Sequence, residues 1–433
     1  MHQLTIDKLG PIQHCVLQIK PYTILTGYQA AGKSTIAKSV YFFRTLKEDL
    51  IQLISRRAYS QIIYREGYAF PDSKDSQCNL KSDFISFARN KFLSTFGTSY
   101  SMNRDMKLSY QYKDAVTITI RLTVSRNSLS PNYVWVDFSP KIVDFLVAHN
   151  STSDLDSLKK ELALLFDDPF ETVYIPAGRS VLTVLGTQFN YFYSTMDDAQ
   201  KRLMDSCTRD YLERVMKLRP QFSNGLEGLL EGEMLSKSHQ QLYQDSIALV
   251  SQILKGKYSV YDGEERIWVD SKHYVKINFA SSGQQEVVWI LNLLAYYLAT
   301  QQKAFFIIEE PESNLFPESQ KLIIELISLT AKAGNSILLT THSPYVLGAA
   351  NNLLYANEVG KDTPEKVERI ISHRKWIDSS IFTALFVQNG TVSNCMDDEL
   401  MQIDNSLLDQ ISHVVNAEYD SLFEIEQEVK GEK

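Results

Sequence analysis

The chain has 433 residues, of which 44% are hydrophobic and 11% aromatic, and its formal net charge is −8. This length and composition exclude a small disulfide- or metal-stabilised peptide and predict a large apolar core divided over two or three lobes. The negative charge gives no global attraction to nucleic acid, so any such binding requires a local basic patch. The four cysteines are far apart and lack the paired spacing of zinc sites or disulfide frameworks.

The start of the chain and its longest apolar stretch bear on the cellular compartment. Residues 1–20 alternate polar and apolar residues, which is typical of a pair of strands and unlike a secretory signal. Residues 287–299 are too few to span a bilayer and include Asn292, so they favour a core helix. A cytoplasmic protein without a membrane segment is expected.

The next element combines a strand, a glycine-rich turn and a helix. Residues 22–26 form a short apolar run, and residues 36–43 continue with helical periodicity. Glycines in the intervening turn allow successive N–H groups to point at phosphate oxygens, helped by the positive end of the following helix. The residues predicted to bind a nucleotide here are Gly27, Tyr28, Gln29, Ala30, Ala31, Gly32, Lys33, Ser34 and Thr35. We call this segment the phosphate loop.

Two members of the phosphate loop have specific expected tasks. Lys33 would reach the β and γ phosphates, and the hydroxyl of Ser34 would ligate Mg²⁺. The alternative is a glycine-rich turn of purely structural importance, but the strand before it and the helix after it favour nucleotide binding.

A second buried strand, residues 304–308, ends in two adjacent carboxylates, Glu309 and Glu310. At a strand end they would lie beside the phosphate loop of a neighbouring strand. There Glu309 could hold Mg²⁺, while Glu310 would act as the catalytic group that polarises the attacking water. The alternative is that residues 311–313 begin a helix whose dipole the acids complement.

Two further strings are less specific. In SSGQQE, residues 281–286, Ser282 and Gln285 form a possible capping box for a helix over residues 287–298. Residues 336–340 read as another buried strand that delivers His342 at its carboxyl end. A single histidine is commonly structural, but at this position it could contact the γ-phosphate or the attacking water and act catalytically.

Taken in order, these strings resemble those of ABC-type ATPases of the SMC, RecF and Rad50 kind. The closest similarity is to the compact prokaryotic OLD-family ATPases, such as those of the PARIS and Septu anti-phage systems. The strings that carry it are LTIDKLGPI, YIPAGRS, SSGQQE, IIEEPESNLFPESQ and TTHSPYVL. The Glu-Glu pair departs from the usual Asp-Glu of ABC ATPases, but it is the form that the OLD-like group uses.

The resemblance implies an α/β P-loop NTPase fold: a two-lobed ABC head with an antiparallel β lobe and a helical insertion. It implies a homodimer around two ATP molecules and Mg²⁺. Residues 313–316 would be the D-loop, and Arg179 would lie near the nucleotide. The nucleotide-binding residues supplied by the other protomer would be Ser282, Gly283 and Gln284.

Four segments are expected. Residues 1–178 form the first lobe with the phosphate loop and an antiparallel sheet, which includes residues 115–138. Residues 179–280 form a helical lobe or short arm. Helices are predicted over residues 151–168, before this segment, and over residues 194–254, within it. Residues 281–350 hold the signature, the carboxylates, the D-loop and the histidine. Residues 351–433 close the head and include an amphipathic acidic helix over residues 406–429.

The expected function is that of an ATPase that dimerises around ATP and controls a separate effector, such as a nuclease, in anti-phage defence. The acids after His342 do not form the Asp-x-Asp pair of a Toprim nuclease. The alternative is a RecF- or Rad50-like repair ATPase that clamps DNA. A small-molecule kinase would explain neither SSGQQE nor His342.

Overall fold

The computed structural model describes residues 2–65, 79–123, 133–149, 155–184, 195–197, 204–230, 236–397, 399–404 and 416–422. Its centre is a six-stranded sheet in the order β14-β13-β3-β12-β11-β7. These strands are β3 (Tyr22–Gly27), β7 (Glu171–Ile175), β11 (Ala304–Glu309), β12 (Ser336–Thr341), β13 (Phe382–Gln388) and β14 (Thr391–Asn394). All neighbours run parallel except β13 and β14.

The order of the central strands corrects one expectation. The strand of the two carboxylates, β11, does not adjoin the phosphate-loop strand β3, because β12 lies between them and pairs with both. The two strand ends are therefore about 9–10 Å apart, or two interstrand spacings. Residues at the end of β12 therefore lie between the phosphate loop and the carboxylates.

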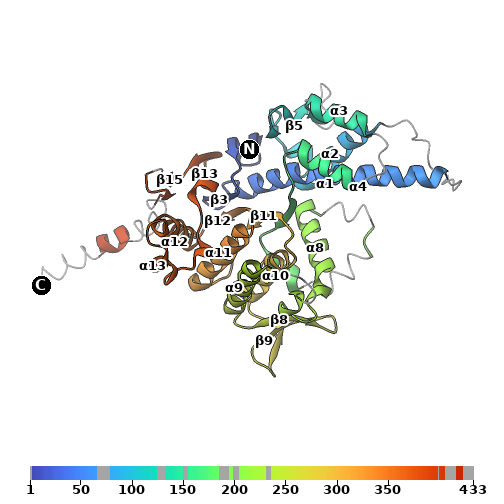
Figure 1. The fold of residues 1–433 in the computed structure, drawn as a ribbon. Helices are drawn as coiled ribbons and strands as arrows, with labels where there is room; N and C mark the ends of the chain where they lie inside the picture. The colour runs from blue at the N-terminus through green and yellow to red at the C-terminus, as the bar shows by residue number, and fades with distance from the viewer. Residues whose placement is uncertain are drawn as a thin grey trace, which may run out of the picture.

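The sheet separates two apolar cores, as expected for parallel strands that are buried on both faces. Every residue of β3, β11 and β12 is buried, and alternate side chains enter opposite cores. Helices α10 (Ser282–Thr300), α11 (Pro317–Lys332) and α12 (Pro344–Gly360) cover one face. Helix α1 (Lys33–Arg65) covers the other face and continues away from the sheet (Figure 1).

A second sheet, fully antiparallel, packs with α1 in the order β2-β1-β4-β5-β6. Its strands are β1 (Gln3–Leu9), β2 (Ile12–Gln18), β4 (Lys107–Lys113), β5 (Val116–Thr123) and β6 (Tyr133–Phe138). Helices α2 (Leu80–Phe96), α3 (Pro140–Ala148) and α4 (Leu155–Leu165) accompany it. The strand pair predicted within residues 1–20 and the antiparallel strands predicted within residues 115–138 are confirmed.

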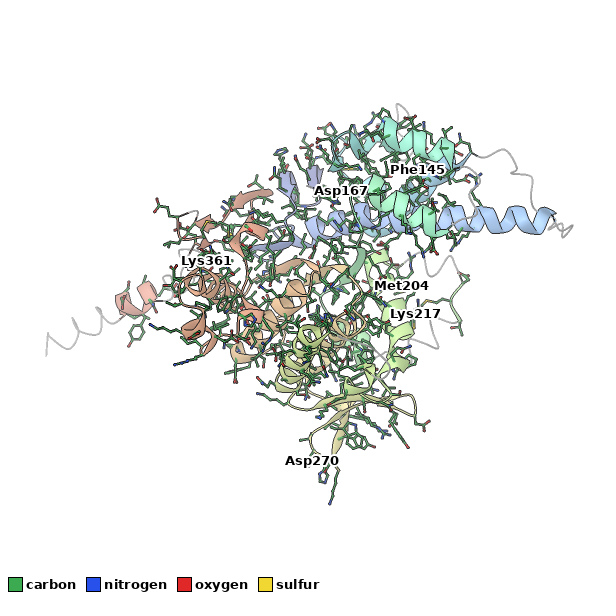
Figure 2. The ribbon with its side chains drawn as sticks, viewed as in Figure 1. Phe145, Asp167, Met204, Lys217, Asp270 and Lys361 are labelled. Atoms are coloured by element: carbon green, nitrogen blue, oxygen red, sulfur yellow. The ribbon has the colours of Figure 1, made fainter. Side chains whose placement is uncertain are left out.

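Between β7 and β11, the chain forms a mainly helical region with a small sheet at its far end. Helices α5 (Arg179–Val184), α8 (Ser206–Leu218) and α9 (Lys237–Leu254) precede β8 (Lys257–Tyr261), β9 (Glu264–Trp268) and β10 (Tyr274–Lys276). The described parts of residues 194–254 include the expected helices, whereas the three-stranded sheet was not predicted. Asp270 marks its tip (Figure 2).

The last part of the chain returns to the central sheet. After α13 (Pro364–Glu368), β13 pairs with β3, and β15 (Met396–Asp397) pairs with β16 (Gln402–Ile403). Of the helix predicted over residues 406–429, only residues 416–422 are described, and they are helical. Within the described residues, no helix is both long and apolar enough to cross a membrane.

Candidate nucleotide-binding and catalytic site

The phosphate loop connects β3 to α1 by a sharply bent backbone. Gly27, Ala30 and Gly32 all have positive φ angles, of 139°, 60° and 109°. A Cβ atom on Gly27 would lie 2.2 Å from the carbonyl oxygen of Val387 in β13, and one on Gly32 would lie 2.4 Å from Ile12. Glycine is thus required at both positions, because the backbone has a positive φ and because a neighbouring segment leaves no room for a Cβ atom. Tyr28, Gln29, Ala30 and Ser34 are exposed at the surface of the loop, whereas Ala31 and Thr35 are partly buried.

Lys33, the first residue of α1, folds over the loop that precedes it. Its Nζ donates to the carbonyl oxygens of Gly27 and Tyr28, each at 2.8 Å, and lies 3.0 Å from Nδ1 of His342. Burial lowers the pKa of the ammonium, while the charge of Glu310 opposes this effect. The lysine is therefore anchored where a phosphate bound by the loop would meet it.

His342, directly after β12, bridges the two strand ends that β12 separates. Its Nε2 lies 2.8 Å from Oε1 of Glu310, and its Nδ1 lies 3.1 Å from the carbonyl oxygen of Gly27. The hydrogen bond from His342 lowers the pKa of Glu310, and the same bond raises the pKa of His342. Lys33, His342 and Glu310, which the sequence placed on three separate strings, thus form one connected cluster.

Glu310 occupies a left-handed backbone conformation, with φ of 44°. Its N–H donates to the carbonyl oxygen of Thr340 at 3.0 Å, and its carbonyl oxygen accepts from the N–H of Ser313 at 3.1 Å. Non-glycine residues in this region are strained and occur where surrounding contacts hold them. We call residues 309–313 the catalytic turn. It contains no helix, since α11 begins only at Pro317, so the predicted alternative of a helix start over residues 311–313 is wrong.

The carboxylate of Glu309 fits a hydrated metal ion. It is buried, its Oε2 accepts from the N–H of Ala177 at 3.3 Å, and its Oε1 has no hydrogen-bond partner among the described residues. A buried, unpaired carboxylate oxygen is costly unless a cation or water satisfies it. No group of three or more His, Cys, Asp or Glu side chains that could hold a metal occurs in the described residues. Mg²⁺ here would therefore depend on Glu309, the exposed hydroxyl of Ser34 and phosphate oxygens.

One functional candidate, Glu312, was not singled out from the sequence. It is buried, and its Oε1 accepts two hydrogen bonds, from the hydroxyl of Thr341 at 2.6 Å and from the N–H of His342 at 2.9 Å. Burial raises the pKa of this carboxyl. Glu312 thus ties the catalytic turn to the end of β12. The Pro-Glu that follows the two carboxylates was the available signal, but only the fold shows what this glutamate contacts.

The signature turn, residues 281–284, begins α10. Its capping box uses Ser281 and Gln284, one residue earlier than the predicted Ser282 and Gln285. Ser281 and Ser282 are exposed, and Gln284 is partly buried. A Cβ atom on Gly283 would lie 2.6 Å from the carbonyl oxygen of Asn314. The signature turn therefore packs on the predicted D-loop of its own chain, and the hydroxyl of Ser281 is used within the turn, where it contacts Gln284.

Arg179 lies inside the molecule at the start of α5, with no exposed side-chain surface. Its guanidinium donates to the carbonyl oxygens of Glu309 and Glu310, at 2.6 and 3.0 Å. The family resemblance implied a position near the nucleotide. The structure places it directly behind the catalytic turn.

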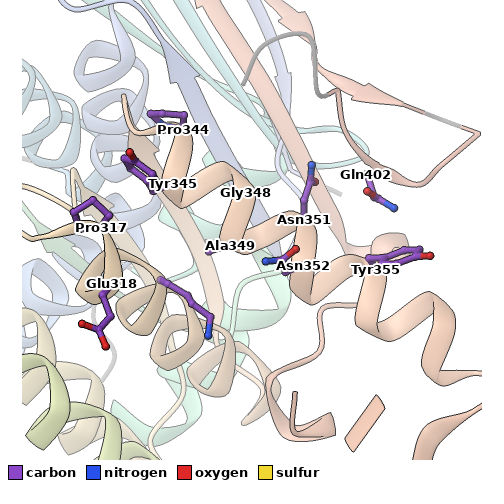
Figure 3. Close-up of a pocket in the computed structure, with 11 residues that line it drawn as sticks. Pro317, Glu318, Pro344, Tyr345, Gly348, Ala349, Asn351, Asn352, Tyr355 and Gln402 are labelled. Atoms are coloured by element: carbon purple, nitrogen blue, oxygen red, sulfur yellow. The ribbon is translucent and has the colours of Figure 1, made fainter. Parts of the chain in front are cut away.

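A separate groove of about 580 Å³ opens between α11 and α12. Pro317 and Tyr345, near the starts of these helices, line one end, and Tyr355 lies farther along α12 (Figure 3). Its lining includes no residue of the phosphate loop or of the catalytic turn. It is therefore distinct from the candidate nucleotide site.

Residues 171–347 match the family model of the AAA ATPase domain. This segment begins at β7, contains the signature and catalytic turns, and ends in the first turn of α12. The chain is an ATPase. Its substrate is accordingly ATP, and the phosphate loop before this segment is the predicted site for it. No curated protein matches the sequence.

Three solved structures are similar over most of the chain. The SMC head bound to the C-terminal winged-helix domain of ScpA is 10% identical, with a TM-score of 0.41, and the match covers 90% of this chain and 95% of that one. The SMC head with an extended coiled coil, bound to the C-terminal domain of ScpA derived from Pyrococcus furiosus, is 11% identical, with a TM-score of 0.36 and coverage of 91% and 96%. The SMC head from Thermotoga maritima is 11% identical, with a TM-score of 0.35 and coverage of 90% and 96%. The P-loop ATPase fold follows from the strand order and from the geometry of the phosphate loop.

Proposed function

We propose that two copies of this chain bind two ATP molecules at a shared interface, and that the resulting cycle of closing and opening controls a separate effector. In each site, the phosphate loop and Glu310 of one copy would face Ser282 and Gly283 of the other. ATP would then act as the contact that joins the copies, and hydrolysis would release them.

The observation that carries this proposal is a pair of exposed phenylalanines beside the signature turn. Phe279, two residues before the turn, is 81% exposed, and Phe316, at the end of the predicted D-loop, is 76% exposed. Gly283 packs against Asn314, so these two segments are neighbours. Large apolar side chains gathered around exposed polar groups mark an interaction surface. A second copy would cover them and bring its own phosphate loop to the signature turn.

The same arrangement supports the chemistry of hydrolysis. Glu310 is held half-buried beside His342, near the start of the catalytic turn, where it could accept a proton from the attacking water. Lys33 would stabilise charge that develops on the phosphates, and Glu309 with Ser34 would hold Mg²⁺, which neutralises phosphate charge. His342 contacts both the phosphate loop and Glu310, so binding of a γ-phosphate beside His342 could change the position of Glu310.

The effector is proposed from the resemblance of the motifs to OLD-like ATPases of anti-phage systems. In this role the ATP-bound pair would hold a toxic partner, such as a nuclease, and infection would alter the cycle. Phe279 and Phe316 do not distinguish this role from others, because they support the pairing of copies and not the choice of effector.

A complementation experiment tests the shared site directly. Lys33→Ala removes ATP binding at a copy's own phosphate loop, and Ser282→Arg blocks the signature turn that serves the partner. Each variant alone should be inactive. When mixed, a heterodimer would contain one intact site, and random pairing predicts about a quarter of the wild-type ATPase activity. Activity of the mixture no greater than that of either variant alone would contradict the shared site.

The partner is tested with Glu310→Gln, which should bind ATP without hydrolysing it and so trap the closed pair. The mass of the Glu310→Gln protein in solution should double with ATP and Mg²⁺, because two copies associate. Glu318→Gln makes the same change at an exposed position of α11 and, as the control, should behave like wild type. The trapped protein is then recovered from its native host. A nuclease or other toxic protein in fixed stoichiometry would support effector control. Recovery of DNA without a protein partner would favour a DNA-clamping repair ATPase instead.

A further inference from the structure

The guanidinium of Arg179 makes four hydrogen bonds and one ion pair inside the molecule. Nη1 donates to the carbonyl oxygens of Pro176 and Glu309, and Nη2 donates to the carbonyl oxygen of Glu310. Nε donates to the carbonyl oxygen of Glu286 at 3.0 Å, and Nη2 lies 3.2 Å from the Oε1 of the same residue. A guanidinium has five N–H groups in a rigid fork, and here four of them make hydrogen bonds while Nη2 also forms an ion pair with Glu286. One side chain thereby joins three separate segments of the chain.

Glu286 completes the connection from the side of α10. Its Oε1 accepts from the backbone N–H of Arg179 at 3.0 Å, and its Oε2 accepts from that of Ser180 at 2.7 Å. Glu286 is 2% exposed and lies directly after the signature turn, in the second turn of α10. The backbone at the start of α5 is therefore held by the helix that begins at the signature turn.

The carbonyl groups that Arg179 holds belong to the strained part of the catalytic turn. Glu310 has a φ of 44°, a conformation that persists only when its surroundings enforce it. Arg179 and the N–H of Ser313 both bind the carbonyl oxygen of Glu310, and Arg179 also binds that of Glu309. The guanidinium thus contributes to the direction in which the Glu310 carboxylate points.

We infer that Arg179 is a positioning residue that couples the signature helix α10 to the catalytic turn within one chain. A displacement of α10 at Glu286 is transmitted through the guanidinium to the carbonyl groups of Glu309 and Glu310. The carboxylate of Glu310 is then aligned for catalysis only when the signature turn and α10 are in the position seen here. This inference rests on the ATPase activity and on the proposed role of Glu310 as the catalytic base.

Lysine is the discriminating substitution at position 179. It keeps the charge opposite Glu286, but an ammonium has three donors on one atom and cannot reach five acceptors on three segments. Arg179→Lys should therefore lower kcat by about 10- to 100-fold, the loss expected when a catalytic group is misplaced by about 1 Å. The dissociation constant for a non-hydrolysable ATP analogue should remain within about threefold of wild type, because no phosphate-loop contact involves Arg179.

Arg44→Lys is the matched control. Arg44 is equally buried and pairs with Asp168 at 2.6 Å, but it makes no hydrogen bond to the catalytic turn. Both lysine variants should lower the urea midpoint, since each disturbs a buried ion pair, whereas only Arg179→Lys should lower kcat. If Arg179→Lys does not fold, Arg179→Met with Glu286→Gln removes both charges together and keeps a side-chain oxygen as acceptor for the N–H groups of Arg179 and Ser180. This double variant should fold and show the same loss of kcat.

Three results would overturn the inference: an unchanged kcat in Arg179→Lys, an equal loss in Arg44→Lys, or a wild-type kcat in the folded Arg179→Met/Glu286→Gln variant. Glu310→Gln separates this outcome from failure of the proposed mechanism. If Glu310→Gln hydrolyses ATP normally, the catalytic assignment itself is wrong. If Glu310→Gln is inactive while Arg179→Lys is normal, only the coupling is wrong. The double variant Arg179→Lys/Glu310→Gln should be no slower than Glu310→Gln, because both act on one group.

Discussion

Glu312 offers a sharp test of how the catalytic turn is held against β12. Its Oε1 accepts from the hydroxyl of Thr341 and from the N–H of His342, while its Oε2 has no partner among the described residues. Glutamine can retain both hydrogen bonds with its carbonyl oxygen, whereas leucine of similar size can retain neither. We therefore expect Glu312→Gln and Glu312→Leu to differ strongly, although both remove the same charge.

The expected magnitude follows from the groups left without partners. Each of the two buried donors that loses its acceptor costs about 1–3 kcal/mol, so Glu312→Leu should lower the free energy of unfolding by roughly 2–6 kcal/mol. Glu312→Gln should change it by no more than about 1 kcal/mol, because the lost charge was itself costly to bury. The leucine variant should also hydrolyse ATP more slowly, since the backbone of His342 is no longer fixed.

Urea denaturation at several pH values provides the assay. Burial raises the pKa of Glu312 above its ordinary value of 4.5. A raised folded-state pKa means that the stability contributed by the protonated group is fully present below pH 4.5 and is lost as the pH rises through the folded-state pKa. Glutamine does not titrate, so the glutamine variant should gain stability relative to wild type as the pH rises. Equal destabilisation by Gln and Leu, or a difference between wild type and Gln that is independent of pH, would refute this reasoning.

Three further predictions concern other positions. Gly27→Ala places a Cβ atom 2.2 Å from the carbonyl oxygen of Val387 and strains a positive φ, so we expect a loss of at least about 1–3 kcal/mol in unfolding free energy and loss of ATP binding by titration calorimetry. Gly283→Ala, whose Cβ atom would lie 2.6 Å from the carbonyl oxygen of Asn314, should displace the signature turn; ATP should still bind, but the ATP-dependent mass change should disappear. Burial lowers the pKa of His2 to about 4, so its contribution to stability, roughly 3 kcal/mol, is present above pH 6.5 and is lost as the pH falls toward 4. His2→Gln should remove this pH dependence in urea titrations, and an unchanged slope between pH 4 and 6.5 would contradict the assignment.

The sequence alone predicted the elements whose signal is local. The strands that end at Gly27, Glu309 and Thr341 could be read because continuous apolar runs are typical of strands buried on both faces. The phosphate loop could be read because its chemistry depends on residue type and spacing within nine positions. The capping box of α10 was predicted one residue too late. Ser281 and Ser282 are equally suited to cap a helix, and only the backbone conformation shows that Ser281 is the N-cap.

Contacts between distant segments were decided only by the tertiary structure. The position of β12 between β3 and β11 places His342 against both Lys33 and Glu310, and no local pattern encodes the order of parallel strands. Glu312 looks like an ordinary charged residue in the sequence, and the family resemblance placed Arg179 only near the nucleotide. Neither set of contacts could be read, because the partners lie on segments that are far away along the chain. Residue types determined that this protein handles phosphate. The packing of the sheet determined which residues can act together on it.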